Sequence, residues 1–152
     1  MGLFKKTTKP SQQAYAVVTG AGSGIGQSFA LALGKRGGTV VCADINLAAA
    51  EKTVALLAEH GAKAYAVACD VGQAEQVADL AEQAEQLMQH PVTLVINNAG
   101  VGLGGKFDEL SLEDWQWVTH VNLWGVIVVS LFVLTLLASL GYAIKKGALN
   151  WE

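Results

Sequence analysis

The amino-acid sequence predicts an α/β fold in which a parallel sheet of about four strands carries helices on both faces. Short apolar runs alternate with amphipathic runs along residues 14–96, and each amphipathic run is long enough for a crossover helix between parallel strands. Glycine, aspartate or asparagine follows the apolar runs, where a parallel sheet gathers its ligands. Hydrophobic residues make up 52% of the 152 residues and charged residues 15%, which supports a packed core.

The first predicted unit is a strand over Ala14 to Val18, a glycine-rich turn and a helix over Ile25 to Lys35. The turn, Thr19 to Gly26, has the spacing G-x-x-x-G-x-G. Glycines in such a turn permit positive φ angles and let backbone N–H groups approach a pyrophosphate, which then lies at the positive end of the helix. The sequence has no G-x-x-x-x-G-K-[ST], so a P-loop is not expected. Taken alone, the run is also compatible with an ordinary loop.

The second predicted strand, Thr39 to Ala43, ends in Asp44. A carboxylate at this place accepts hydrogen bonds from the hydroxyls of an adenosine ribose and repels a 2′-phosphate by charge. Asp44 therefore favours NAD over NADP as the bound dinucleotide. The alternative is that Asp44 only helps to start the next helix, which we expect over Leu47 to His60 because its apolar residues share one face.

The third predicted strand, Lys63 to Cys69, is followed by Asp70 and Val71. The Asp70 side chain is expected at the edge of an adenine ring, and it can also serve as the N-cap of the next helix, Gln73 to Gln89. That helix repeats apolar residues at helical spacing and carries its acidic residues elsewhere, which indicates a solvated face and not a site.

A fourth strand is predicted over Val92 to Ile96, directly before the segment Asn97 to Gly100. The glycine turn, Asp44, Asp70 and Asn98 then all fall at the C-terminal ends of parallel strands. Ligands of open parallel sheets bind at that edge, so this convergence makes the glycine turn a stronger signal than it is alone.

These segments resemble, in order and intervals, the short-chain dehydrogenases/reductases over residues 13–126. The matching residues are Thr19-Gly20-x-x-x-Gly24-Ile25-Gly26, Asp44, Asp70-Val71, Asn97-Asn98-Ala99-Gly100 and Asn122. The resemblance implies a Rossmann-like, doubly wound domain that binds a nicotinamide dinucleotide and serves hydride transfer between nicotinamide and an alcohol or carbonyl carbon. The implied cofactor-binding residues are Gly20, Gly22, Ser23, Gly24, Ile25, Gly26, Asp44, Asp70, Val71, Asn98, Ala99 and Gly100.

The catalytic part of the family's pattern is not expected in this chain. In the family a Tyr acts as acid and base, a Lys one helical turn later lowers its pKa, and a Ser positions the substrate oxygen. The Asn that matches Asn122 helps to hold a water-mediated proton relay. Tyr142 and Lys146 do spell Y-x-x-x-K, but they follow Asn122 too closely for a strand to carry the Ser. An intact small enzyme is therefore the least favoured interpretation.

The segment from Leu123 to Ile144 is uncharged and rich in Val and Leu. Ser111, with Asp114 three residues later, is expected to begin one long helix that runs into this apolar segment. Such a helix can span a membrane, or it can pack partly on the sheet and associate with a second copy of the chain. Self-association is the favoured alternative, because Lys145 and Lys146 would place the cofactor domain outside the cell.

The sequence divides into a flexible basic arm (1–12), a dinucleotide-binding domain (13–122) and an apolar helix with a polar tail unlike the family (123–152). The net charge of −3 and the lack of a basic face argue against nucleic acid as a partner. Cys42 and Cys69 have no metal-ligand spacing, so buried reduced thiols and no metal site are expected. The basic arm precedes no apolar run and is not a signal peptide, which favours a cytoplasmic, possibly membrane-associated, location.

Two functional interpretations follow. The first is the NAD(H)-binding portion of a short-chain dehydrogenase/reductase, truncated before its catalytic Ser-Tyr-Lys by a foreign or frame-shifted C-terminus. The alternative is a non-catalytic nucleotide-binding or membrane-attached protein that keeps only the fold.

Overall fold

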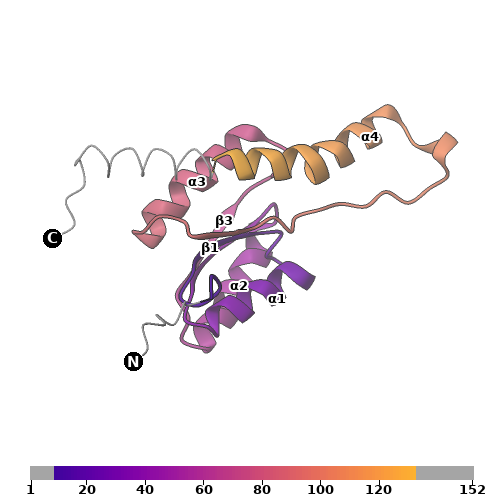
Figure 1. The fold of residues 1–152 in the computed structure, drawn as a ribbon. Coiled ribbons are helices and arrows are strands. Elements are labelled where there is room, and N and C mark those ends of the chain that lie inside the picture. The colour runs from indigo at the N-terminus through magenta and orange to yellow at the C-terminus, as the bar shows by residue number, and fades with distance from the viewer. Residues whose placement is uncertain (1–8, 133–152) are drawn as a thin grey trace, which may run out of the picture.

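The computed structural model describes residues 9–132, in which every predicted strand and helix of residues 14–96 is present with small shifts at the ends (Figure 1). The strands are β1 (Tyr15–Thr19), β2 (Thr39–Asp44), β3 (Ala64–Ala68) and β4 (Leu94–Ile96). The helices are α1 (Gly24–Gly34), α2 (Leu47–Glu59), α3 (Ala74–Met88), the 3-10 helix η1 (Phe107–Glu109), α4 (Leu112–Thr119) and the π-helix η2 (His120–Trp124). Residues 125–132 are helical again.

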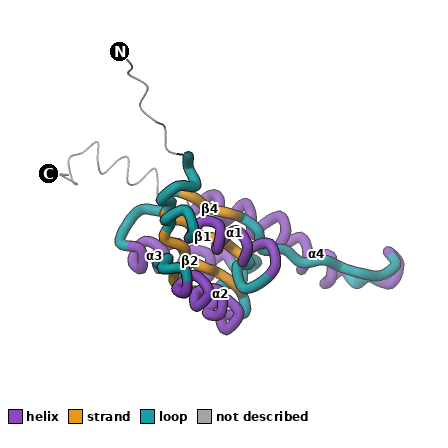
Figure 2. The backbone as a smooth tube through the Cα atoms, turned by 90° about the horizontal axis from the view of Figure 1, so that it is seen from below, coloured by secondary structure: helices purple, strands orange, loops and turns teal. Residues whose placement is uncertain are grey.

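The strands are all parallel and lie in the order β3-β2-β1-β4. The helices α1 and α2 cover one face of this sheet, whereas α3, η2 and the helix of residues 125–132 cover the other (Figure 1, Figure 2). The predicted α/β fold with a Rossmann-like, doubly wound sheet is therefore confirmed. The strand order reverses between β1 and β4, and this switch point leaves a crevice at the C-terminal ends of the strands.

Successive side chains along each strand point to opposite faces of the sheet and so divide the core into two layers. On β1, Val17 faces α3, η2 and the helix of residues 125–132, whereas Val18 faces α1 and α2. The strand register places Val17 between Val41 of β2 and Val95 of β4. The central strands are thus buried on both faces, which explains why their sequences are continuous apolar runs and not alternating ones.

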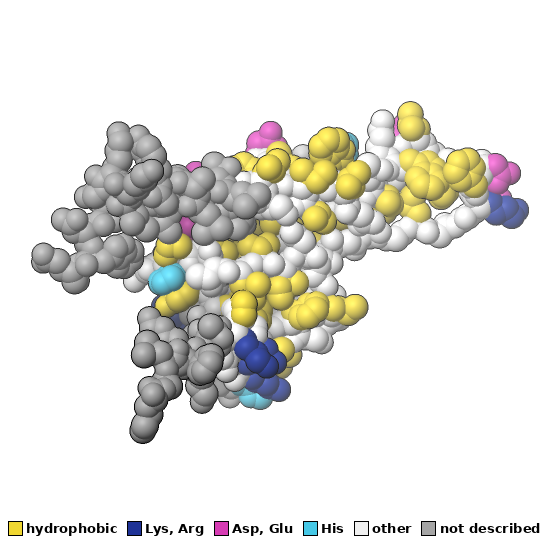
Figure 3. Space-filling view, viewed as in Figure 1, with side chains coloured by type: hydrophobic (Ala, Val, Ile, Leu, Met, Phe, Trp, Pro, Cys, Tyr) yellow, Lys and Arg dark blue, Asp and Glu magenta, His cyan; other side chains and the backbone are white. Residues whose placement is uncertain are grey.

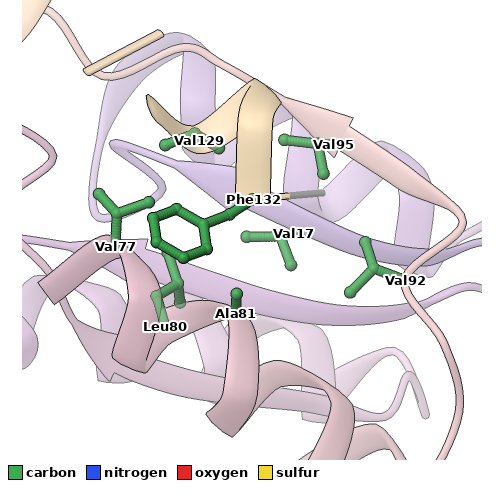
Figure 4. A pocket seen from close by; sticks show the side chains of 8 residues that line it. All are labelled: Val17, Val77, Leu80, Ala81, Val92, Val95, Val129 and Phe132. Carbon is green, nitrogen blue, oxygen red and sulfur yellow. The ribbon is translucent and has the colours of Figure 1, made fainter. Parts of the chain in front are cut away.

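One packing gap lies between the sheet, α3 and the helix of residues 125–132 (Figure 4). It is lined by apolar side chains only, which are Val17, Val77, Leu80, Ala81, Val92, Val95, Val129 and Phe132. Its volume of about 20 Å³ corresponds to a single water molecule, and an apolar gap of this size offers water no hydrogen-bond partner. The gap therefore belongs to the core and is not a ligand site.

The β4 strand is shorter than predicted, because Thr93 pairs with β1 partly through its side chain. The Thr93 N–H donates to the carbonyl of Tyr15 at 2.8 Å, while the Tyr15 N–H donates to Oγ1 of Thr93 at 3.0 Å. A hydroxyl oxygen thus replaces the carbonyl that a regular strand would supply. The Tyr15 ring also stacks on His90, with 3.7 Å between ring centroids, and closes this end of the sheet.

The helix α4 begins at the predicted capping box. Oγ of Ser111 accepts a hydrogen bond from the Asp114 N–H at 3.1 Å, and Oδ2 of Asp114 accepts one from the Ser111 N–H at 2.9 Å. Hydrogen bonds from the backbone and then the hydroxyl of Ser111 lower the pKa of Asp114. The helical periodicity does not predict the π-helix His120–Trp124, which interrupts the long helix after α4.

The helix α4 extends beyond the sheet together with the loop before it (Figure 1). None of its residues is buried, and the next buried positions along the chain are Val121, Gly125 and Val129. Within residues 9–132, no helix is both long and apolar enough to cross a membrane. The predicted apolar segment, Leu123 to Ile144, continues past the described residues, and most of the predicted basic arm also lies outside them.

We expect Leu57→Ala to lower the free energy of unfolding by about 2–5 kcal/mol, because it leaves a cavity in the core. Leu57 is 1% exposed and occupies the space beside Gly34 where α2 packs on α1. Its neighbour Leu56 is 36% exposed, so Leu56→Ala is a matched control with an expected loss of about 0.5 kcal/mol or less. Urea unfolding followed by circular dichroism measures both, and equal losses would contradict this packing of α2.

Candidate functional site

In the turn between β1 and α1, some glycines adopt positive φ angles and others let neighbouring atoms pack closely against the backbone. Gly20 and Gly24 have φ angles of +64° and +54°, a region that favours glycine. A Cβ on Gly26 would collide with the carbonyl oxygen of Gly20 and with the side-chain amide of Asn98. The first turn of α1 therefore packs directly on the backbone of the glycine turn.

The end of β2 holds the glycine turn from one side. The Ala21 N–H donates to the carbonyl of Ala43 at 3.1 Å, and the Gly22 N–H donates to Oδ2 of Asp44 at 2.8 Å. Oδ1 of Asp44 accepts from the Asn46 N–H at 2.9 Å. Asn46, and not Asp44, is the N-cap of α2, so Asp44 only orients the residue that caps the helix. Each carboxylate oxygen retains a lone pair for a ligand.

The end of β4 holds the glycine turn from the other side. Nδ2 of Asn98 donates to the carbonyl oxygens of Thr19 and Gly20 at 3.0 and 3.3 Å. In return, Oγ1 of the buried Thr19 accepts from the N–H groups of Asn98 and Ala99 at 3.0 and 3.1 Å. Thr19 was not among the predicted site residues, because a threonine before a glycine run has this role only once β4 lies beside β1.

The N-terminus of α1 offers hydrogen-bond donors to the crevice. The first N–H groups of an α-helix have no acceptor within the helix, and the N-cap Ser23 makes no capping bond with its side chain. The Gln27 N–H makes the first helical bond, to the carbonyl of Ser23 at 3.1 Å. A Cβ on Gly24 would meet no atom within 4 Å, so the space in front of these donors is open. An anionic group is stabilised there by the donors and by the helix dipole.

A pocket of about 460 Å³ lies at the C-terminal ends of the strands, between the glycine turn and the long helix. Its volume suits a nucleotide-sized ligand. Ten of the predicted cofactor-binding residues line it: Gly20, Ser23, Gly24, Ile25, Asp44, Asp70, Val71, Asn98, Ala99 and Gly100. The predicted residues Gly22 and Gly26 support the turn from behind the lining. The structure adds Ile45, Cys69, Val101, Trp117 and Val121 to the lining.

Asp70 keeps one carboxylate oxygen for the pocket. Its Oδ1 accepts from the Gly72 N–H at 2.9 Å, and its own N–H donates to Oε1 of Gln76 at 2.8 Å. Asp70 was also predicted to serve as the N-cap of α3. The structure shows Gln73 as that N-cap, so Asp70 does not have this role. No described residue donates to its second oxygen, Oδ2.

Large apolar side chains stand exposed at the pocket. Ile45 is 73% exposed, Ile25 is 70% exposed and Trp117 is 47% exposed. Apolar area of this size beside a pocket usually meets a ligand or another molecule. Trp117 comes from α4, where its sequence context contains no binding motif, so the sequence alone did not predict its position.

Asn122 fastens the long helix to the loop after β4. Its Oδ1 accepts from the Val101 N–H at 2.9 Å, and its Nδ2 donates to the Val101 carbonyl at 2.8 Å. Asn122 lies within the π-helix η2, and π-bulges of this kind are frequent at functional sites. Val101 and Val121 line the pocket beside it, whereas the Asn122 side chain itself is outside the lining.

Cys42 and Cys69 are buried free thiols, as predicted. Burial raises the pKa of Cys42 to about 12. Burial, followed by the negative charges of Asp70 and Asp79, raises the pKa of Cys69 to about 11. Both thiols are therefore neutral near pH 7, and Cys69 meets the pocket as an apolar contact and not as a nucleophile.

The pocket lining contains no tyrosine, lysine or histidine within the part of the chain that the structure describes. The Y-x-x-x-K pair of Tyr142 and Lys146 lies outside the described residues. Residues 9–132 also contain no cluster of three side chains that could hold a metal ion. The described residues are therefore suited to binding and orienting a ligand, and Asn122 lies next to the pocket but outside its lining.

The model of the family described as short chain dehydrogenase matches residues 14–147. The chain belongs to the short-chain dehydrogenase family. The matched range extends beyond residues 13–126, which carried the predicted resemblance, and includes the helix of residues 125–132. Family members share the parallel sheet with covering helices that the structure shows.

Three similar proteins illustrate the relationship. "Probable oxidoreductase EphD" from Mycobacterium tuberculosis is 42% identical over 111 residues, which are 72% of this chain and 18% of that protein. The crystal structure of a short chain dehydrogenase/reductase from Burkholderia phymatum in complex with NAD has a TM-score of 0.80 and 38% identity, covering 85% of this chain and 46% of that one. A short chain dehydrogenase from Burkholderia cenocepacia J2315 in complex with NADP has a TM-score of 0.78 and 28% identity, with coverages of 84% and 52%.

This family member therefore spans about half of the length of both solved chains and a smaller share of the mycobacterial oxidoreductase.

Proposed function

We propose that the chain binds NAD(H) in the pocket at the strand ends, as the cofactor-binding portion of an oxidoreductase that transfers hydride between nicotinamide and an alcohol or carbonyl carbon. One observation carries the proposal: Asp44 and the first N–H groups of α1 face the same pocket. A carboxylate that accepts from hydroxyls and an anion-attracting helix end match the adjoining ribose and pyrophosphate of a dinucleotide. Of the two solved neighbours, one holds NAD and the other NADP.

The lining residues fit the successive parts of such a cofactor. We assign the adenine to the apolar surface of Ile45 and Val71 beside Asp70, and the adenosine ribose to Asp44. The pyrophosphate is assigned to the N–H groups that begin α1, where glycine leaves the approach open. The remaining ribose and the nicotinamide are assigned to the side of Asn98 to Gly100. The volume of the pocket and the order of these groups support one extended ligand.

The charge of the lining favours NAD(H) over NADP(H). Asp44 brings a negative charge to the position of the adenosine ribose, and no described lysine or arginine lines the pocket to pair with a 2′-phosphate. The 2′-phosphate of NADP(H) would therefore be repelled by the Asp44 carboxylate, and no described positive charge in the lining would offset this repulsion.

When bound, the nicotinamide would supply the donor or acceptor of the hydride, whereas proton transfer needs protein groups. Asn122 is the family's relay residue within the described part, and its side chain already bonds twice to Val101. We assign it the role of fixing the loop after β4. The alternative function, a non-catalytic NAD(H)-binding protein, is supported by a described lining without an acid or base.

We expect the chain to bind NADH at least about tenfold more tightly than NADPH, since 1.4 kcal/mol of repulsion corresponds to a factor of ten. Isothermal titration with both cofactors measures this ratio. Asp44→Ala is expected to narrow the ratio and to weaken NADH binding, because the ribose contact and the hydrogen bond to Gly22 are both lost. Asp108→Ala, on the exposed helix η1, is the control. Equal or tighter NADPH binding would contradict the assignment.

We expect the chain by itself to oxidise secondary alcohols with NAD at background rates. General acid–base catalysis contributes roughly two to four orders of magnitude, and the described lining offers no group for it. NADH absorbance over a panel of alcohols measures the turnover. Activity that is lost in Tyr142→Phe but kept in Tyr65→Phe would overturn the expectation and would establish Tyr142 and Lys146 as the acid–base pair.

We also propose that the long helix is a surface for self-association. Large exposed apolar side chains gather along α4 and the helix after it (Figure 3): Leu112, Trp115, Leu123, Trp124 and Ile127. Exposed apolar side chains gathered on one element usually meet another molecule, and a second copy of the chain would present the same side chains in return.

Sedimentation velocity at several concentrations without detergent tests this proposal. The chain is expected to form dimers or larger species, and Trp124→Gln is expected to shift it toward monomer, because Trp124 is 52% exposed. Leu56→Gln, at a partly exposed site on α2, is the control. A single monomer at every concentration would contradict self-association, whereas recovery only in detergent would favour the membrane alternative.

A further inference from the structure

We propose that Thr53 is a positioning residue for the glycine turn. Its hydroxyl fixes the orientation of the peptide between Ala21 and Gly22, and thereby the anion-binding end of α1. Thr53 lies on α2, outside the pocket lining and outside every motif that the sequence indicated. The expected effect on affinity rests on the proposed NAD(H) binding, whereas the effect on the turn can be measured without a ligand.

Thr53 is a fully buried polar side chain with a defined set of partners. Its Oγ1 donates to the carbonyl oxygen of Ala21 at 2.8 Å and accepts from Nε2 of Gln27, on α1, at 3.0 Å. The carbonyl of Ala49, one turn earlier in α2, is more distant at 3.4 Å. A hydroxyl has one proton, and Gln27 occupies an acceptor position of the oxygen, so the proton goes to the nearer carbonyl of Ala21.

The carbonyl of Ala21 and the N–H of Gly22 belong to the same peptide unit, and this unit is held at both ends. Thr53 donates to its oxygen at 2.8 Å, and Oδ2 of Asp44 accepts from its N–H at 2.8 Å. The oxygen and the hydrogen of a trans peptide point in opposite directions. Two partners on opposite sides therefore define a single orientation of the peptide plane.

Loss of the Thr53 hydroxyl would leave the Ala21 carbonyl without its buried partner, which is unfavourable. Gly22 has no Cβ to oppose rotation of the peptide. A rotated peptide would turn the Ala21 oxygen toward Asp44 and withdraw the N–H from the carboxylate. The oxygen would then repel both the carboxylate and an anionic ligand, so Thr53 protects the affinity of a pocket that it does not line.

Amide hydrogen exchange of the ligand-free chain tests the effect on the turn. Thr53→Val keeps the shape of the side chain and removes the hydroxyl, so exchange of the Ala21 and Gly22 amides, which bond to Ala43 and Asp44, is expected to be about tenfold faster, measured relative to the amides of β2. Thr53→Ser restores the hydroxyl and should exchange like the wild type. Thr119→Val is the matched control, because the Thr119 hydroxyl bonds only to a carbonyl of its own helix, that of Trp115 at 2.7 Å.

Titration with NADH tests the effect on affinity. Thr53→Val is expected to weaken binding about tenfold, whereas Thr53→Ser and Thr119→Val stay within about twofold of the wild type. If Thr53→Val does not fold, Gln27→Met removes only the second hydrogen bond and should weaken binding by about threefold.

Two results distinguish this inference from the proposed function. Wild-type exchange of the turn and wild-type NADH affinity in Thr53→Val would overturn the inference and leave NAD(H) binding intact. Faster exchange of the turn in Thr53→Val, together with no NADH binding by the wild-type chain, would overturn the proposed function and support the role of Thr53 in the turn.

Discussion

The hydrogen bonds of Asn98 hold the site together, because they join the last described strand to the turn that follows the first. Its side chain bonds the carbonyls of Thr19 and Gly20, while the Thr19 hydroxyl accepts from the Asn98 backbone. The C-terminal ends of β1 and β4 are thereby fixed in one register, although they are far apart in the sequence. Gly26 packs against the same two groups, Gly20 and Asn98, so the direction of α1 depends on them as well.

The parts of the fold that could be predicted are those that local sequence patterns determine. Buried strands gave continuous apolar runs, and Asp44 and Asp70 could be placed at the pocket because they directly follow the predicted strands. The shortening of β4 could not be predicted, because the Thr93 hydroxyl replaces a backbone acceptor without changing the periodicity. Thr53 and Trp117 lie within amphipathic helices, where the pattern indicates a face but not a partner from another element.

The long helix, which consists of α4, η2 and residues 125–132, also combines features that neighbouring residues determine with features that depend on residues far away in the sequence. Its start was predictable because the capping residues are neighbours in the sequence, whereas no local pattern indicates the π-helix, in which Asn122 bonds to Val101. Residues spaced by four along this helix lie on one side of it. Trp117 and Val121 thus reach the pocket, and Val129 reaches the core of the sheet.

The β4 strand pairs with β1 over three residues and has no described strand on its other side. A dinucleotide in the pocket would contact the residues after β4 as well as those after β1 and β2. Its binding energy would be gained only while β4 is docked, so occupancy of the pocket would raise the free energy needed to detach this strand. Detachment of β4 and binding of the ligand would then be coupled equilibria, and each bound cofactor would stabilise the edge of the sheet where β4 pairs with β1.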